Sequence, residues 1–183
     1  MPYYRRNRSG RMFFFTIVCS GRRNLLHVEA FRKMLHDAYE LTRSERPWRT
    51  EAIVLLPNHL HFMWRMPEGD TDYSTRIAVI KTQFTKAFLK NDGLELAVTQ
   101  GQARHRRRGV WQERFWEHTI RDAKDFRMHL DYIHLNPVKH GLASRPKDRP
   151  WSSFQQHVKD GGYEEDWCGR SDLPENVEYY LPE

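Results

Sequence analysis

The chain has few of the features that mark secreted, metal-cluster or membrane proteins. Its 183 residues include only two cysteines, Cys19 and Cys168, and no CxxC spacing, so neither a disulfide framework nor a zinc finger is expected. No apolar run reaches the length of a membrane-spanning helix, and residues 1–8 lack the apolar core of a signal peptide. We therefore expect a cytoplasmic protein, and the length fits one domain with a substantial core.

The charge is unevenly distributed along the chain. Residues 1–150 contain 28 basic and 16 acidic side chains, whereas residues 151–183 contain two basic and eight acidic ones. A basic body of this kind suits a polyanionic ligand such as nucleic acid. We predict one domain over residues 1–150, beginning with a basic arm, and an acidic tail over residues 151–183 that packs on it.

The pattern of apolar residues predicts an alternation of strands and helices. Residues 12–19 are aromatic and β-branched, as in a buried strand. Residues 25–45 have Leu26, Ala30, Met34, Ala38 and Leu41 at helical spacing. The later predicted elements are a hairpin of strands 48–56 and 59–66, a helix over 73–91, a mobile loop over 92–110, an extended segment over 110–119, and a helix that begins at Asp122 and ends near residue 135, because Pro137 disfavours a helical Asn136.

This order predicts an α+β protein with a ferredoxin-like split βαβ fold. Its sheet would be antiparallel, with two helices on one face. The last helix would then cover part of the opposite face. A site could form between that helix and the sheet.

Two histidines open one strand of the predicted hairpin. Side chains alternate along a strand, so His59, His61 and Met63 should share one face, and Leu60, Phe62 and Trp64 the other. Two neighbouring imidazoles on one face make half of a divalent-metal site. The simpler interpretation is that both histidines lie on a solvated face.

The last predicted helix carries a polar stripe of its own. At helical spacing, Asp125, His129, Tyr132 and Asn136 lie beside the apolar stripe of that helix. An amide oxygen from Asn136 could complete a mixed nitrogen and oxygen site with His59 and His61, which suits Mg²⁺ or Mn²⁺. Alternatively, Asn136 caps a turn that begins at Pro137, and Tyr132 only packs in the core.

Taken together, these residues suggest phosphoryl transfer. A phenol has a pKa of about 10 and is a poor nucleophile at neutral pH. A bound divalent cation neutralises the charge that builds up on a phosphate and orients it for attack. The oxygen of Tyr132 could then attack the phosphorus and form a covalent phosphotyrosine.

Three segments resemble one family. The sequence PNHLHF at 57–62 is similar to the HUH motif of single-strand DNA endonucleases, in which an apolar residue separates two histidines. The sequences FWEHTIR at 115–121 and DYIHLNPVKHGL at 131–142 resemble single-tyrosine transposases, and the REP-associated tyrosine transposases in particular. The resemblance extends over residues 10–168. It differs from the family pattern in two places: many single-tyrosine relatives have Gln at position 136, and the basic loop 92–110 resembles an insertion.

The resemblance implies a fold and an activity. The fold would be ferredoxin-like, and the enzyme would cut single-stranded DNA at palindromic repeats, leaving a 5′-phosphotyrosine and a free 3′-hydroxyl. Tyr132 would be the nucleophile, and His59, His61 and Asn136 the metal ligands. The substrate would be a hairpin with a short single-stranded foot. This branch of the family implies a monomer, with a dimer as the alternative.

Basic and aromatic side chains suggest a DNA surface. Candidates for phosphate contacts are the arm Arg5, Arg6, Arg8 and Arg11 and the loop Arg104, Arg106, Arg107 and Arg108. Tyr3, Tyr4, Trp111 and Trp116 could stack on unpaired bases, unless the tryptophans belong to the core. Two other functions stay open: a nucleic-acid-binding regulator without catalysis, and a hydrolase that uses water in place of Tyr132.

Overall fold

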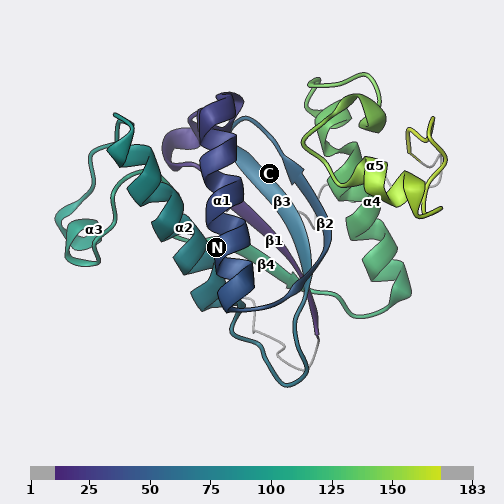
Figure 1. Cartoon of the computed structure of the whole chain (residues 1–183), viewed down its shortest axis with the longest axis horizontal. Helices are drawn as coiled ribbons and strands as arrows, with labels where there is room; N and C mark the ends of the chain where they lie inside the picture. The colour runs from purple at the N-terminus through teal and green to yellow at the C-terminus, as the bar shows by residue number, and fades with distance from the viewer. Residues whose placement is uncertain (1–10, 170–183) are drawn as a thin grey trace.

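The structure is a computed structural model and describes residues 11–169. Figure 1 shows a central sheet with helices on both faces. The strands are β1 (Met12–Val18), β2 (Arg49–Leu55), β3 (His59–Arg65) and β4 (Trp116–Thr119), the helices are α1 (Glu29–Glu45), α2 (Tyr73–Lys90), α3 (Gln100–Arg104), α4 (Ala123–Lys139) and α5 (Phe154–Lys159), and short 3₁₀ turns lie at Ser20–Arg22, Leu25–His27 and Pro146–Asp148.

The four strands form one antiparallel sheet in the order β2-β3-β1-β4. Helices α1 and α2 cover one face, and α4 and α5 lie on the other (Figure 1). This is the ferredoxin-like α+β fold that the order of elements predicted. The register places His61 of β3 between Thr16 of β1 and Val54 of β2. The first histidine of the pair, His59, is therefore at one end of the sheet and His61 lies further inside it.

Strand alternation divides the core into two layers, as predicted for β3. Leu60, Phe62 and Trp64 point to the α1 and α2 side, in one cluster with Phe13 and Phe15 of β1. Burying a large apolar side chain contributes about 1.5–3 kcal/mol, so these aromatic residues fix which face of β3 the two helices cover. The histidines are consequently left on the other face.

The second layer lies between the sheet and α4. Phe14, Ala52, Val54 and Met63 of the sheet pack with Leu130 and Ile133 of the helix. The chain after α4 packs in the same layer through Phe154 and Tyr163. Residues 170–183, the end of the predicted acidic tail, lie outside the described part of the chain. None of the helices in residues 11–169 has the length and apolarity needed to cross a bilayer.

Two predictions about helices and loops were wrong in detail. Helix α1 begins at Glu29, and its buried residues are Leu35, Ala38, Tyr39 and Thr42, whereas Leu41 is exposed. The segment 92–110, predicted as a loop throughout, contains the short helix α3. Thr99 and Gln102 form a capping box at its start, which compensates the unpaired N–H groups of the first turn.

The end of α4 was also predicted wrongly. The helix continues through Pro137 to Lys139. Proline at this position removes one helical hydrogen bond, but both Asn136 and Pro137 are buried, and packing outweighs the local preference. Asn136 is therefore helical, one turn beyond Tyr132 and on the same side of the helix.

Candidate active site

The two histidines of β3 are buried under α4, so the interpretation that they lie on a solvated face is wrong. His59 is 2% exposed and His61 is 0% exposed. Their ring centroids are 4.8 Å apart. The sheet and the helix thus hold two imidazoles together, away from bulk water.

A neighbouring oxygen orients each imidazole. His59 donates from Nδ1 to Oδ1 of Asn58 at 2.5 Å, and Nδ1 of His61 lies 2.8 Å from the hydroxyl of Thr16. With Nδ1 protonated in both rings, each Nε2 presents a lone pair, which is the form that binds metals. Burial, followed by the positive charges of neighbouring basic residues, lowers the pKa of His61 well below its usual value. His61 is therefore neutral at physiological pH.

Tyr132 of α4 lies directly beside the histidine pair. Its ring centroid is 5.1 Å from that of His61, with the rings edge to face, and it also contacts Phe14 of β1. Tyr132 is 7% exposed. The helix and the sheet therefore hold the phenol in one orientation against an imidazole.

Asn136 follows Tyr132 by one turn on the buried side of α4. It is 1% exposed, and its backbone carbonyl oxygen accepts from the backbone N–H of His140. The rings of His140 and His59 are 5.3 Å apart. Tyr132 contacts His61, and His140 contacts His59. Asn136 lies between Tyr132 and His140 in the sequence, and therefore between these two contacts.

Unsatisfied buried atoms test whether these residues fit a divalent cation. Nε2 of His61 and both amide atoms of Asn136 are buried with no hydrogen-bond partner among the described residues. Leaving a buried polar group unsatisfied costs about 1–3 kcal/mol, and a bound ion is one of the ways in which such groups are satisfied. Imidazole nitrogens with an amide oxygen form a mixed nitrogen and oxygen donor set for a divalent cation, and the oxygen ligand is of the kind that Mg²⁺ and Mn²⁺ prefer. The residues present therefore fit such an ion.

Two further side chains at the end of α4 lie near Tyr132 and the histidine pair. Nζ of Lys139 lies 5.9 Å from the ring centroid of Tyr132, and His140 faces His59. A phosphate and a developing phenolate are both anions, so the positive charge of Lys139 at this distance favours them. Sequence reasoning did not assign a role to Lys139 or His140.

A second polar cluster joins β4 to α4. The carboxylate of Asp125 accepts from Nε2 of His118 at 2.9 Å and from the backbone and guanidinium of Arg121 at 3.0 Å. Nδ1 of His129 lies 3.1 Å from the same carboxylate. Burial would raise the pKa of Asp125, but these hydrogen bonds hold it well below its usual range. We call these four residues the Asp125 clamp.

The Asp125 clamp has the residue types of a metal site, because His118, Asp125 and His129 present donor atoms within 4.8 Å of one another. Its hydrogen bonds indicate another role. Nδ1 of His129 donates to the backbone oxygen of Asp125 at 2.8 Å, and the positive guanidinium of Arg121 occupies one carboxylate oxygen. The cluster therefore serves to attach the helix of Tyr132 to the edge strand.

Of the basic residues predicted to bind DNA, those that the structure describes are not gathered at this site. Arg11 is exposed near Glu68, whereas Arg5, Arg6 and Arg8 lie outside the described residues. The loop arginines Arg104, Arg106, Arg107 and Arg108 are exposed, and α3 with its flanking chain projects beyond α2, on the far side of the sheet from α4 (Figure 1). Of the two tryptophans, Trp111 packs partly against the α1 and α2 core and Trp116 against the α4 core.

Comparisons with known proteins agree with this geometry. No family model matches the chain. A REP-associated tyrosine transposase of Escherichia coli is 41% identical over 171 residues, which are 92% of each protein. A relative from Haemophilus influenzae with the same family name is 43% identical over 174 residues, 94% of this chain and 97% of that protein.

A solved structure shares the fold as well as the sequence. It is described as a REP-associated tyrosine transposase bound to a REP hairpin. Its TM-score is 0.77 and its identity 39%, over 96% of each chain. Fold and site together define a ferredoxin-like protein in which a helix tyrosine faces a histidine pair. By the identity and coverage of its relatives, the chain belongs to the REP-associated tyrosine transposase family.

Proposed function

We propose that this protein is a metal-dependent endonuclease and transposase that nicks and rejoins single-stranded palindromic repeat DNA through a 5′-phosphotyrosine. The observation that supports it best is the meeting of Tyr132 with the buried pair His59 and His61. Nε2 of His61 and the amide of Asn136 have no hydrogen-bond partner among residues 11–169. A cation at these atoms would explain why they are buried.

In this proposal each residue has a distinct role. His59, His61 and Asn136 would hold Mg²⁺ or Mn²⁺, which when bound supplies positive charge to a phosphate oxygen and orients the group. The oxygen of Tyr132 forms the bond to phosphorus, and the bond from phosphorus to the 3′-oxygen breaks. The phenol loses its proton and the departing 3′-oxygen gains one. Lys139 lies where it would favour the anionic phenol and the phosphate.

The covalent product explains how the strand could be rejoined. The phosphotyrosine is a phosphodiester, so a 3′-hydroxyl can attack it and restore the DNA without another energy source. A relative at 39% identity is bound to a REP hairpin, and we propose hairpin DNA with a single-stranded foot as the substrate here. The exposed loop arginines Arg104, Arg106, Arg107 and Arg108 would contribute phosphate contacts.

A denaturing gel tests the proposal. The full-length protein is incubated with a labelled single-stranded palindrome, with and without Mn²⁺. We expect a labelled species at the mass of protein plus DNA only with the metal. Cut DNA without a protein-linked product would favour attack by water, and binding without cleavage would favour a regulator. Either result would refute the tyrosine mechanism.

A further inference from the structure

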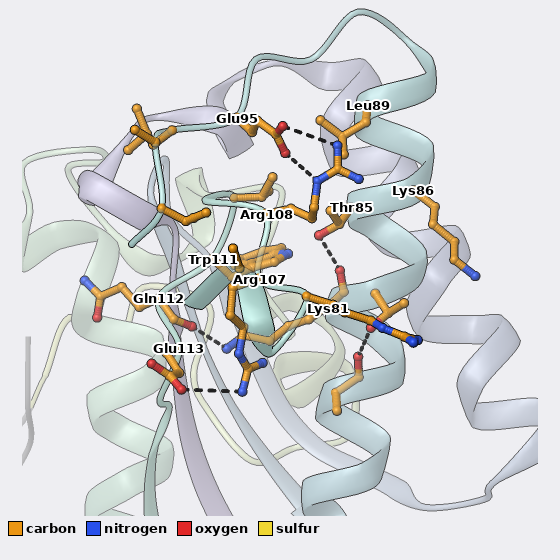
Figure 2. Close-up of a pocket in the computed structure, with 18 residues that line it drawn as sticks. Lys81, Thr85, Lys86, Leu89, Glu95, Arg107, Arg108, Trp111, Gln112 and Glu113 are labelled. Carbon is orange, nitrogen blue, oxygen red and sulfur yellow. Dashed lines mark hydrogen bonds and ion pairs between the residues drawn. The ribbon is translucent and has the colours of Figure 1, made fainter. Parts of the chain in front are cut away.

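A cavity of about 1240 Å³ lies between α2 and the chain from Glu95 to Glu113. It is on the α1 and α2 side of the sheet, opposite the face that carries Tyr132. Figure 2 shows residues of α2 on one side and the segment from Glu95 to Glu113, which we call the returning chain, on the other. Arg106, Arg107 and Arg108, proposed above as phosphate contacts, line this cavity, but the cleavage step does not use it.

The charges that line the cavity are mostly positive. Five cationic side chains line it, against two carboxylates. Arg108 pairs with Glu95 at 2.6 Å and Arg107 with Glu113 at 3.7 Å, and these exposed pairs contribute little stability. The cationic residues are Lys81, Lys86, Arg106, Arg107 and Arg108.

Two of these cations remain available for a ligand. No ion pair joins Lys86 or Arg106 to another residue in the described range 11–169. Lys81 donates to the carbonyl oxygen of Gln112 at 2.7 Å, and burial, followed by the charge of Arg107, lowers its pKa to about 8. An anion in the cavity would reduce the electrostatic repulsion between Lys81 and Arg107.

Part of the cavity wall is apolar. The larger apolar lining residues are Leu89 of α2 and Leu96, Val98, Val110 and Trp111 of the returning chain. The ring of Trp111 is fixed edge to face against Phe84, with centroids 5.0 Å apart. Apolar and cationic side chains lining the same cavity are the combination that binds an unpaired base and its phosphate.

Backbone hydrogen bonds connect this cavity to the histidine pair. Gln112 donates to the carbonyl oxygen of Val18 at 2.8 Å, and Cys19 donates to that of Asn58 at 2.8 Å. Asn58 precedes His59. The cavity and the candidate active site are thus at the same end of the sheet, on opposite faces.

We propose that this cavity receives one unpaired nucleotide of a DNA hairpin, with the base against the apolar side chains and the phosphate at the cationic ones. The inference depends on the proposed function, because it assumes that the protein binds such DNA. A site of this kind would distinguish hairpins that offer an unpaired nucleotide at the correct distance from the nicked phosphate.

The test uses the full-length protein without divalent metal, so that binding is measured without cleavage. A series of labelled hairpins carries an abasic site at each unpaired position in turn, and affinities are measured by fluorescence anisotropy. For the unaltered protein we expect one abasic position to weaken binding about tenfold, as for the loss of one stacked base. If no position has such an effect, the proposal is wrong.

Cavity variants then locate that nucleotide. Thr85→Trp places a large ring in the cavity from α2, where Thr85 lines it (Figure 2). We expect this variant to bind the intact hairpin about tenfold more weakly and to lose its sensitivity to the critical abasic site. Gln83→Trp, on the same helix but outside the cavity lining, should keep that sensitivity. Equal sensitivity in Thr85→Trp and the unaltered protein would overturn the proposal.

Two charge-reversal variants provide the same test if Thr85→Trp does not fold. Lys86→Glu changes a cavity residue, and Lys90→Glu changes an exposed residue one turn further along α2 that does not line the cavity. We expect only Lys86→Glu to remove the abasic effect, and equal behaviour of the two variants would contradict the cavity. A protein that forms the tyrosine adduct but shows no cavity effect refutes this inference alone. A protein that forms no adduct refutes the proposed function.

Discussion

The rings of His61 and Tyr132 lie edge to face with their centroids 5.1 Å apart, one on the sheet and the other on α4. The two residues are 71 positions apart in the sequence, so only the packing of α4 on the sheet brings them together. Any displacement of α4 would separate the proposed nucleophile from the histidine pair.

We expect the phenol oxygen of Tyr132 to be needed for adduct formation but not for the stability of the fold. Tyr132→Phe removes that oxygen and keeps the ring contacts with Phe14 and His61. We expect the free energy of unfolding to change by less than about 1.5 kcal/mol and the affinity for hairpin DNA to be retained, while the covalent adduct disappears. Urea denaturation, anisotropy and a denaturing gel measure the three quantities, and an adduct in Tyr132→Phe would refute the assignment.

Thr16 is expected to tune metal binding through His61. Thr16→Val keeps the shape of the side chain but removes the hydroxyl 2.8 Å from Nδ1 of the imidazole. Loss of such a partner lowers metal affinity about 10- to 100-fold. Calorimetric titration with Mn²⁺ measures it. Thr50→Val is the matched control, because its hydroxyl bonds to Tyr39 on the other face of the sheet, and the two variants should differ in Mn²⁺ affinity.

Lys139 is expected to affect the rate of adduct formation. It is exposed at the end of α4, with Nζ 5.9 Å from the ring of Tyr132. Lys139→Gln should slow adduct formation at saturating DNA by about tenfold or more, since it removes a charge that favours the transition state. Lys124→Gln, in the first turn of the same helix, should react at the normal rate. Single-turnover kinetics would contradict the role of Lys139 if both variants behave alike.

The Asp125 clamp is expected to stabilise the fold in a way that depends on pH. Asp125→Asn should lower the free energy of unfolding by about 2–4 kcal/mol at pH 7, because charged hydrogen bonds to a buried carboxylate are lost. The pKa of Asp125 is depressed in the folded state, so its contribution is complete above the unfolded pKa and declines as the pH falls below it.

Urea denaturation at several pH values measures this contribution. The difference between the unaltered protein and Asp125→Asn should be constant from pH 5 to 7 and shrink below about pH 4. A difference that does not depend on pH would show that the carboxylate charge is not what stabilises the helix.

Periodicity alone predicted which residues of the candidate site share one face. The helical spacing of Asp125, His129, Tyr132 and Asn136 placed them on one face, and all four are buried against the sheet. Alternation along β3 likewise separated His61 from Phe62. Both rules depend only on the local backbone, which the sequence determines strongly where apolar residues recur at a fixed period.

The remaining features depend on contacts between distant segments. Thr16 lies opposite His61 because of the register of β1 and β3, which no local pattern reveals. The continuation of α4 through Pro137 reflects packing against a local preference. The role of His118 in the Asp125 clamp requires the pairing of the edge strand β4 with β1, and the cavity beside α2 requires the fold of the whole segment 95–113.

The most direct measurement of the central claim is peptide mapping of the covalent product. After incubation with a single-stranded palindrome and Mn²⁺, the protein is digested with nuclease and trypsin and analysed by mass spectrometry. The peptide from Met128 to Lys139 contains Tyr132 as its only tyrosine. We expect a nucleotide mass on Tyr132 in that peptide, and a nucleotide on another residue, or cleaved DNA with no modified peptide, would contradict the account.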